Sequence, residues 1–275
     1  MQSSRDRFQE LLSRGDNDFN LAEVALLIAC EHYSTLDVSA YLNRLDRMGR
    51  EAEVFLPVRP STRDSIDALN RYLYQHVGLV GNQLEYYDPR NSFLNDVLDR
   101  SMGIPITIAV VYLELGWRLS LPLYGIGMPG HFLLGCRDGG DTIIVDAFNG
   151  GRECSAKECA DMIARIYGGA LPFQPAMLNA VTRRDIVIRM LGNLRVISGQ
   201  QRNHAESLRW SDLNVIASRE SARSLRERGA VRLAAGDISG ARGDLSAALQ
   251  RATDDDERRE SELLLHHIEQ SERAE

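Results

Sequence analysis

His131 and Asp146 are the two residues of this sequence whose types and spacing fit acid–base chemistry. They lie in two apolar, alternating segments separated by one turn, so adjacent antiparallel strands would bring them together. The carboxylate in such a pair orients the imidazole, which takes the proton of a nucleophile. The helix predicted before them opens with Gly103-Ile-Pro-Ile-Thr-Ile-Ala109, and Pro105 has no nucleophilic or ionisable side-chain atom. The sequence therefore predicts a catalytic triad that lacks its nucleophile.

Two other side chains near the pair are poor substitutes for that nucleophile. Thr107 carries the hydroxyl nearest to Pro105, but it lies two residues further along the helix and points away, which favours capping or packing. Cys136 lies five residues after His131 on one predicted strand, hence on the opposite face of the sheet. We expect the His131 ring within hydrogen-bond or one-water reach of Asp146. The ring should face the first turn of the Pro105 helix, with no sulfur close by.

Tyr87, Asn91 and Asn149 are candidate binding residues, together with Thr107. Tyr87 precedes an Asp-Pro turn signal and is compatible with a cleft wall and with core packing alike. Asn149 begins an Asn-Gly-Gly turn after Asp146, where backbone dihedral angles alone explain the glycines. The alternative to a functional site is a His–Asp bridge that merely satisfies two polar groups in a cleft.

The elements that must position these residues follow from hydrophobic periodicity. Apolar residues at helical spacing predict two or three amphipathic helices across residues 5–49. Asp18 or Asn20 would cap one of these helices, and Asp37 the next. The helix that starts at Pro105 is apolar nearly all round, which predicts burial. Further helices are predicted at 66–77 and near 93–98, and strands at 121–126, 131–136 and 142–148.

The sequence becomes purely helical and more charged from about Arg183. Ala205 and Ala241 lie 36 residues apart (241 − 205), each near the start of a second helix after a short turn. Small residues at such positions let paired helices approach closely, as in tetratricopeptide repeats. We therefore predict two domains: a helical lead-in with an α+β domain over 1–182, and a tetratricopeptide-like domain over 183–275.

Composition excludes several classes of function for this 275-residue chain, which is 44% hydrophobic and 26% charged. A net charge of −7 argues against binding to nucleic acid, which normally needs a basic face. No run of about 20 apolar residues predicts a membrane span, and the polar N-terminus leads into no signal core, so we expect a cytoplasmic protein. The spacing of the four cysteines predicts neither a metal site nor a disulfide framework, and no cofactor is predicted.

Four motifs, in this order, resemble those of the SirB-type family of bacterial transglutaminase-like proteins with a tetratricopeptide-like tail. They are Asn91-Ser-Phe-Leu-Asn-Asp-Val-Leu98, Gly103-Ile-Pro-Ile106, Pro129-Gly-His-Phe-Leu133 and Asp146-Ala-Phe-Asn-Gly-Gly151. The resemblance implies a papain-like transglutaminase core, in which a buried helix presents a cysteine and a small antiparallel sheet supplies histidine and aspartate. His131 and Asp146 match the last two positions, whereas the cysteine position falls on Pro105. Ala147 stands where the family usually has proline.

The expected function follows from this missing cysteine. We expect a non-catalytic binding or regulatory protein on a degenerate transglutaminase-like fold, with a protein or peptide partner bound through the helical repeats. The alternative is a hydrolase or protease-like enzyme that uses His131 as general base on a water, together with Asp146. A metal would be poorly held by these two side chains, because protein metal sites usually supply at least three ligands. The sequence does not indicate an oligomeric state.

Overall fold

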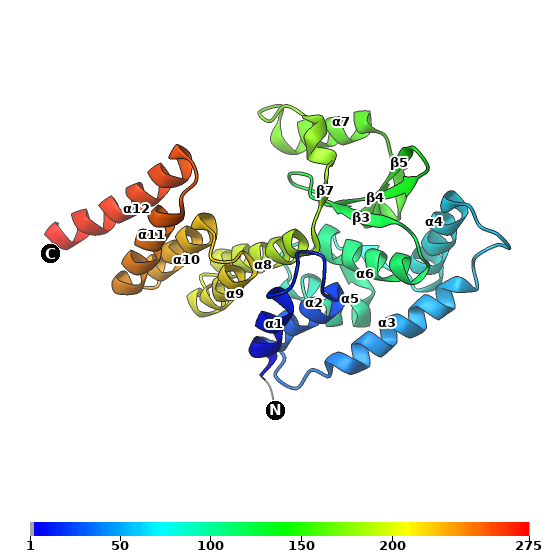
Figure 1. Cartoon of the computed structure of the whole chain (residues 1–275), viewed down its shortest axis with the longest axis horizontal. Helices are drawn as coiled ribbons and strands as arrows, with labels where there is room; N and C mark the ends of the chain where they lie inside the picture. The colour runs from blue at the N-terminus through cyan, green and yellow to red at the C-terminus, as the bar shows by residue number, and fades with distance from the viewer. Residues whose placement is uncertain (1–2, 275) are drawn as a thin grey trace. The chain divides into compact units, whose positions relative to one another are not determined.

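The computed structural model describes residues 3–274, and their side chains from residue 3 to residue 270. The chain divides into two compact units, the first ending at Val187 and the second beginning at Ile188 (Figure 1). The division lies inside helix α8 (Arg183–Gln200). The candidate site belongs entirely to the first unit.

Three helices form the N-terminal part of the first unit: α1 (Ser4–Leu12), α2 (Leu21–Cys30) and α3 (Val38–Glu53). Asn20 caps α2 by accepting the Glu23 N–H, and Asp37 caps α3 in the same way, as the sequence predicted for these two positions. Most of α2 is buried, and it packs on the central helix α6 (Pro105–Arg118). Glu114 of α6 joins the two helices, because its buried carboxylate accepts the Ala22 N–H at 2.9 Å.

The helix predicted at 66–77 begins earlier and changes character. Helix α4 (Thr62–Asn70) runs directly into η1 (Arg71–His76), a π-helical segment. Ser61 caps α4, which moves its start four residues ahead of the predicted position. Within η1 the Val77 N–H donates to the Tyr72 carbonyl, a bond across five residues. No hydrophobic period distinguishes such a turn from an α-helix, so the sequence did not reveal it.

Helix α6 is the core of the first unit, and it starts at Pro105 as the sequence predicted. Its residues are buried from Pro105 to Gly116. Before it come α5 (Leu94–Arg100) and β2 (Met102–Gly103), and β2 pairs in parallel with β1 (Val80–Gly81). This short ribbon leads straight into the first turn of α6.

A five-stranded antiparallel sheet lies against α6, in the order β6-β5-β4-β3-β7. The strands are β3 (Leu123–Ile126), β4 (Leu133–Asp138), β5 (Asp141–Asp146), β6 (Arg152–Cys154) and β7 (Ala180–Val181). The three predicted strands are present, although β4 begins two residues after His131 rather than at it. β6 and β7 were missed because strands of three and two residues carry no alternating pattern.

Helix α7 (Ala156–Tyr167) was also missed, and it covers the sheet face opposite α6 (Figure 1). Its buried residues Cys159 and Ile163 join Leu133 and Ile126 in one apolar cluster. The first unit is therefore a three-layered α+β domain, with a small antiparallel sheet between helices.

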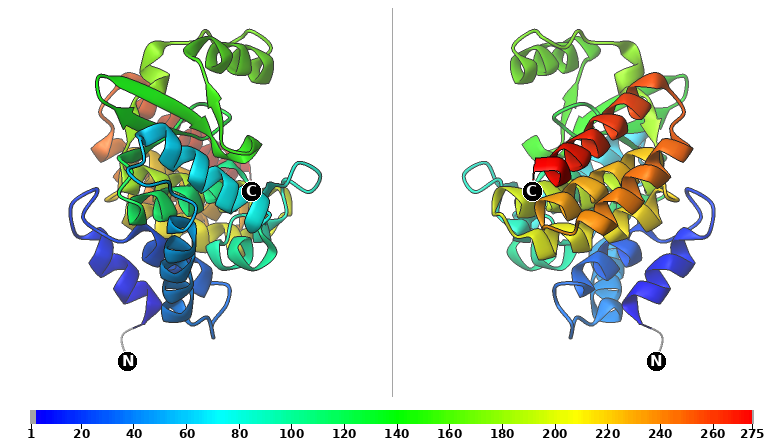
Figure 2. Two further views of the ribbon diagram at one scale, coloured as in Figure 1. Left: turned by 90° about the vertical axis from the view of Figure 1, so that its right-hand side faces the viewer. Right: turned by 90° about the vertical axis from the view of Figure 1, so that its left-hand side faces the viewer.

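The second unit is entirely helical. After α8 come α9 (His204–Ala217), α10 (Ala222–Ala234), α11 (Ile238–Arg251) and α12 (Asp255–Ala274), and from α9 onward each helix packs on the next (Figure 2). A side chain at Gly229 would crowd Leu245 at 3.0 Å, so α10 and α11 approach closely there. Arg228 donates to both oxygens of the buried Asp244 and also to Asp212, which ties α9, α10 and α11 together.

No described helix is both long and apolar enough to cross a membrane.

Candidate functional site

His131 and Asp146 form a buried hydrogen-bonded pair. The distance from His131 Nε2 to Asp146 Oδ1 is 2.9 Å, and the exposed fractions of the two residues are 8% and 0%. Asp146 ends β5, and His131 lies two residues before β4. The antiparallel register of β4 and β5 brings the two positions together. The predicted contact is therefore present in the structure.

The Asp146 carboxylate is satisfied on both oxygens. The Asn149 backbone N–H donates to Oδ1 at 3.3 Å, and the Asn149 side-chain amide donates to Oδ2 at 2.7 Å. Burial by itself would raise the pKa of Asp146, but the hydrogen bonds and charge of His131 and the Asn149 donors outweigh it, so this pKa lies below its usual value. Asp146 is therefore ionised at neutral pH. With Nε2–H donating to it, a neutral His131 ring carries its acceptor on Nδ1.

Phe148 connects this pair to the start of α6. Its ring meets the His131 ring edge-on, with centroids 5.9 Å apart. The Phe148 ring also lies close to Gly81 of β1, where an added Cβ would lie only 2.6 Å from the ring. Gly81 pairs with Gly103, two residues before Pro105. A continuous series of contacts thus leads from the His131 ring to the first turn of α6.

Thr107 holds that first turn together and is not presented to solvent. Its exposed fraction is 0%, and its hydroxyl donates to the Asn91 carbonyl at 2.6 Å while accepting the Ile104 N–H at 3.2 Å. Capping, the favoured interpretation of this residue, accounts for the bond from Ile104, and the bond to Asn91 ties the helix start to the preceding segment. Pro105, at the first helical position, is buried beside it.

Asn91 and Tyr87 belong to one loop and have different surroundings. Asn91 is fully buried, and its side-chain amide donates to the Glu85 carbonyl at 2.7 Å and accepts from Asn82 at 3.2 Å. These bonds hold the segment 82–88. Tyr87 is 56% exposed and contacts the Tyr86 ring edge-on. The neighbouring Leu84 is 98% exposed. The loop is thus fixed at its base and presents apolar side chains to solvent.

The cysteine thiols are not activated. Cys30, Cys136, Cys154 and Cys159 are all free. Burial raises the pKa of the Cys136 thiol to about 11, and burial likewise raises the pKa of Cys154 to about 11. Burial also raises the pKa of Cys30 and Cys159. Among the described residues, no three His, Cys, Asp or Glu side chains are grouped to hold a metal ion.

The lowered pKa of Asp146 predicts an acid-sensitive contribution to stability. Because the folded-state pKa is below the unfolded value, the contribution is present at neutral pH and is lost as pH falls below about 4. Asp146→Asn should lower the free energy of unfolding by about 2 kcal/mol at pH 7, and by less at pH 3. Urea unfolding at both pH values measures this difference.

Asp141→Asn is the control for that measurement, because Asp141 lies exposed at the other end of the same strand. Its effect should stay within about 0.5 kcal/mol at either pH. An Asp146→Asn difference that is equally large at pH 3 and pH 7 would contradict the assignment of an ionised, stabilising carboxylate.

Comparisons with known proteins show the family to which this chain belongs. Residues 39–192 match the sequence model of the Transglutaminase-like superfamily. A UPF0162 protein of Xylella fastidiosa (strain 9a5c) is 35% identical over 253 residues, which cover 88% of each chain. The F-box only protein 21 of Homo sapiens is 34% identical over 137 residues, which are 47% of this chain and 21% of that protein. The crystal structure of menin that reveals its binding site for the Mixed Lineage Leukemia protein aligns with 98% of this chain and 75% of menin. The TM-score of that alignment is 0.43 at 9% identity, which is too low to support an argument.

Proposed function

The chain belongs to the transglutaminase-like superfamily, and from that premise we propose that it is a non-catalytic binding or regulatory protein. One observation carries the proposal: the buried residue that opens α6 is Pro105, at the position where the family resemblance puts the nucleophile. Proline offers no atom for covalent catalysis. The nearest hydroxyl on the helix, that of Thr107, is committed to the Asn91 carbonyl. The described thiols have raised pKa values owing to burial, which disfavours the reactive thiolate.

The His131–Asp146 pair and the exposed Tyr87 loop suit a peptide partner. Asp146 fixes the orientation of the His131 ring, and this ring with its edge-on neighbour Phe148 forms the contact surface that we assign to the peptide main chain. Tyr87 and Leu84 supply apolar surface on a loop that needs little ordering on binding. The same pair that serves acid–base chemistry in a thiol enzyme would here recognise a ligand.

We extend the proposal to the second unit: it is a tetratricopeptide-like helical array, as in the SirB-type family. The close approach at Gly229 and the shared ion pairs of Arg228 support regular stacking of its helices. Such arrays bind extended segments of protein partners. In this proposal the α+β domain binds a peptide, and the helices of the second unit bind a protein partner.

A second candidate function is a cysteine-independent hydrolase. The intact hydrogen bond between His131 and Asp146 favours it, because a carboxylate in this position orients the imidazole for proton transfer. A water that gives its proton to the imidazole would then attack the substrate carbonyl. The two candidates differ in what happens to a bound peptide: a binding protein leaves it intact, and a hydrolase cleaves it.

Peptide display on the full-length chain tests both candidates. We expect enriched peptides whose affinity falls about tenfold in His131→Gln and in Tyr87→Ala, the loss of one good contact each. Val58→Ala is a control, since Val58 is 94% exposed on a different loop and its change should leave affinity unaltered. A bound peptide should remain intact on long incubation when analysed by mass spectrometry. Cleavage that disappears in His131→Gln would replace the binding proposal by the hydrolase.

Full-length protein is needed because a chain cut after Thr182 would lose bonds inside the first unit. Arg184 donates to the Asp16 carboxylate at 2.7 Å and to the Leu12 carbonyl at 2.6 Å. Ile186 and Val187 are buried. Loss of binding in such a fragment would report damage to the fold.

A further inference from the structure

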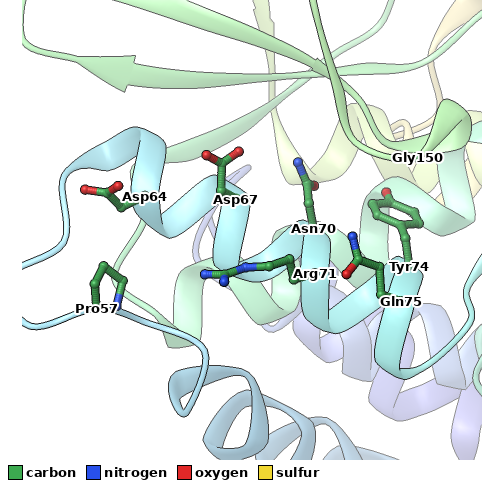
Figure 3. Close-up of a pocket in the computed structure, with 8 residues that line it drawn as sticks. All are labelled: Pro57, Asp64, Asp67, Asn70, Arg71, Tyr74, Gln75 and Gly150. Carbon is green, nitrogen blue, oxygen red and sulfur yellow. The ribbon is translucent and has the colours of Figure 1, made fainter.

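A polar groove of about 510 Å³ runs along α4 and η1, separate from the His131–Asp146 pair (Figure 3). Its volume lies within the range of small-molecule sites. Asp64, Asp67, Arg71 and Gln75 line it, and Gly150 closes one end. The groove therefore has carboxylates, a guanidinium and an amide, and Pro57 and Tyr74 supply apolar surface beside them.

The wall of the groove is built by hydrogen bonds to the turn that follows β5. The side-chain amide of Asn70 donates to the Gly151 carbonyl at 2.9 Å, and its oxygen accepts the Tyr112 hydroxyl at 2.9 Å. Tyr74 donates its hydroxyl to the Ala147 carbonyl at 2.6 Å. The bonds to Gly151 and Ala147 fix α4 and η1 against a segment 73 to 81 residues away in sequence. A ligand would meet a preformed surface.

Two opposite charges in the groove lack a charged partner. The Asp67 carboxylate makes no hydrogen bond or ion pair with any other described residue, and Asp67 is exposed. Arg71 donates to the Phe55 carbonyl at 3.0 Å and forms no ion pair with the part of the chain that the structure describes. Oppositely charged side chains four apart on a helix are close enough to pair. Here the Phe55 carbonyl holds the guanidinium away from Asp67, so both charges remain available to a ligand.

Figure 3 shows Asp67 projecting from the helix and the Arg71 guanidinium running back along it below that carboxylate. Asp64 lies one turn earlier, and hydrogen bonds from Ser61 lower the pKa of its carboxyl, so it too is ionised. The π-helical segment supplies Arg71, Tyr74 and Gln75 to the groove. Single π turns are frequent at functional sites.

We propose that this groove binds a zwitterionic α-amino carboxylate, as found in a free α-amino acid or a short peptide. The ligand carboxylate would accept from Arg71, and its ammonium group would donate to Asp67 and Asp64. Side chains four apart on a helix have Cβ atoms roughly 5–6 Å apart, a separation that a molecule with both charges on one carbon can bridge. The site is independent of the peptide binding proposed for His131 and Tyr87.

Ligand-observed NMR and calorimetry on the full chain test this assignment with the common L-α-amino acids, each alone, and with their glycyl dipeptides. We expect at least one zwitterion to bind, and its affinity to fall at least about fivefold in Asp67→Asn and in Arg71→Gln, the loss of one exposed ion pair. The N-acetylated and the C-amidated forms of the same amino acid should each bind more weakly by a similar factor. A higher affinity for the free amino acid or for the dipeptide shows which of these two kinds of ligand the groove binds.

Asp161→Asn and Arg165→Gln are matched controls, because these exposed residues of α7 have the same types and the same four-residue spacing. They should leave the affinity unchanged. Absence of binding by every zwitterion overturns the proposal. Binding that survives both Asp67→Asn and Arg71→Gln, or that a singly charged derivative matches, overturns it equally. All four substitutions are at exposed positions, so folded variants are expected.

Discussion

Pro105→Cys is expected to give this chain a thiol that reacts about tenfold faster with iodoacetamide at pH 6 than an unperturbed thiol. The first helical position tolerates the change, since the N–H that cysteine adds there needs no intrahelical partner. A helix N-terminus and a neighbouring imidazolium lower a thiol pKa by about two units or more. That shift raises the thiolate fraction roughly a hundredfold at pH 6. The lower nucleophilicity of a more acidic thiolate removes about tenfold of this gain.

The control places His131→Gln in the Pro105→Cys background, and mass spectrometry locates the modified residue. The native cysteines provide a slow background, because burial raises the pKa of Cys136 and of Cys154 to about 11. The introduced thiol should lose its rate advantage without His131. Equal rates with and without His131 would mean that the start of α6 does not face the ring, and the relation to a thiol enzyme would then be one of fold alone. The experiment thus measures a geometry that the family resemblance implies.

Features fixed by short-range chemistry were predictable from the sequence. Asn20 and Asp37 cap helices because their side chains reach the next free N–H groups. Pro105 opens α6 because its ring suits only the first turn. Predicting the contact between His131 and Asp146 required one further step, the antiparallel pairing of two strands across a tight turn. That pairing is also local in sequence.

Features that depend on contacts distant in sequence were not predictable. The buried role of Asn91 depends on carbonyl and amide groups of a loop that has no regular structure. Strand β7 exists because residues 180–181 return to pair with β3, more than fifty positions after it. The polar groove needs Asn70 to meet Gly151, and no periodicity in either segment signals that meeting. The sequence therefore identified which side chains could do chemistry, and long-range packing decides which of them reach solvent.

Gly151→Ala is expected to lower the free energy of unfolding by about 3 kcal/mol, whereas Gly150→Ala should cost only about 1 kcal/mol. Both glycines have left-handed backbones, with φ of 72° and 76°, so both substitutions carry the penalty of roughly 1 kcal/mol for an L-residue there. They differ in what the added methyl group meets. At Gly150 nothing lies within 4 Å. At Gly151 the methyl group would overlap the Asn70 side-chain oxygen and lie 2.5 Å from Asn70 Cγ and 2.8 Å from the Tyr74 ring.

The extra cost at Gly151 arises because Asn70 cannot move away without losing its own bonds. Its amide donates to the Gly151 carbonyl and its oxygen accepts the buried Tyr112 hydroxyl, so displacement leaves buried polar groups unsatisfied, at a cost of about 1–3 kcal/mol. Urea unfolding of the two variants and of the wild type measures the difference. If Gly151→Ala and Gly150→Ala lower the free energy of unfolding equally, then Asn70 does not hold α4 against the turn after β5. The groove would then lack its fixed wall, and the Asn149 donors that hold Asp146 would lose the support of this turn.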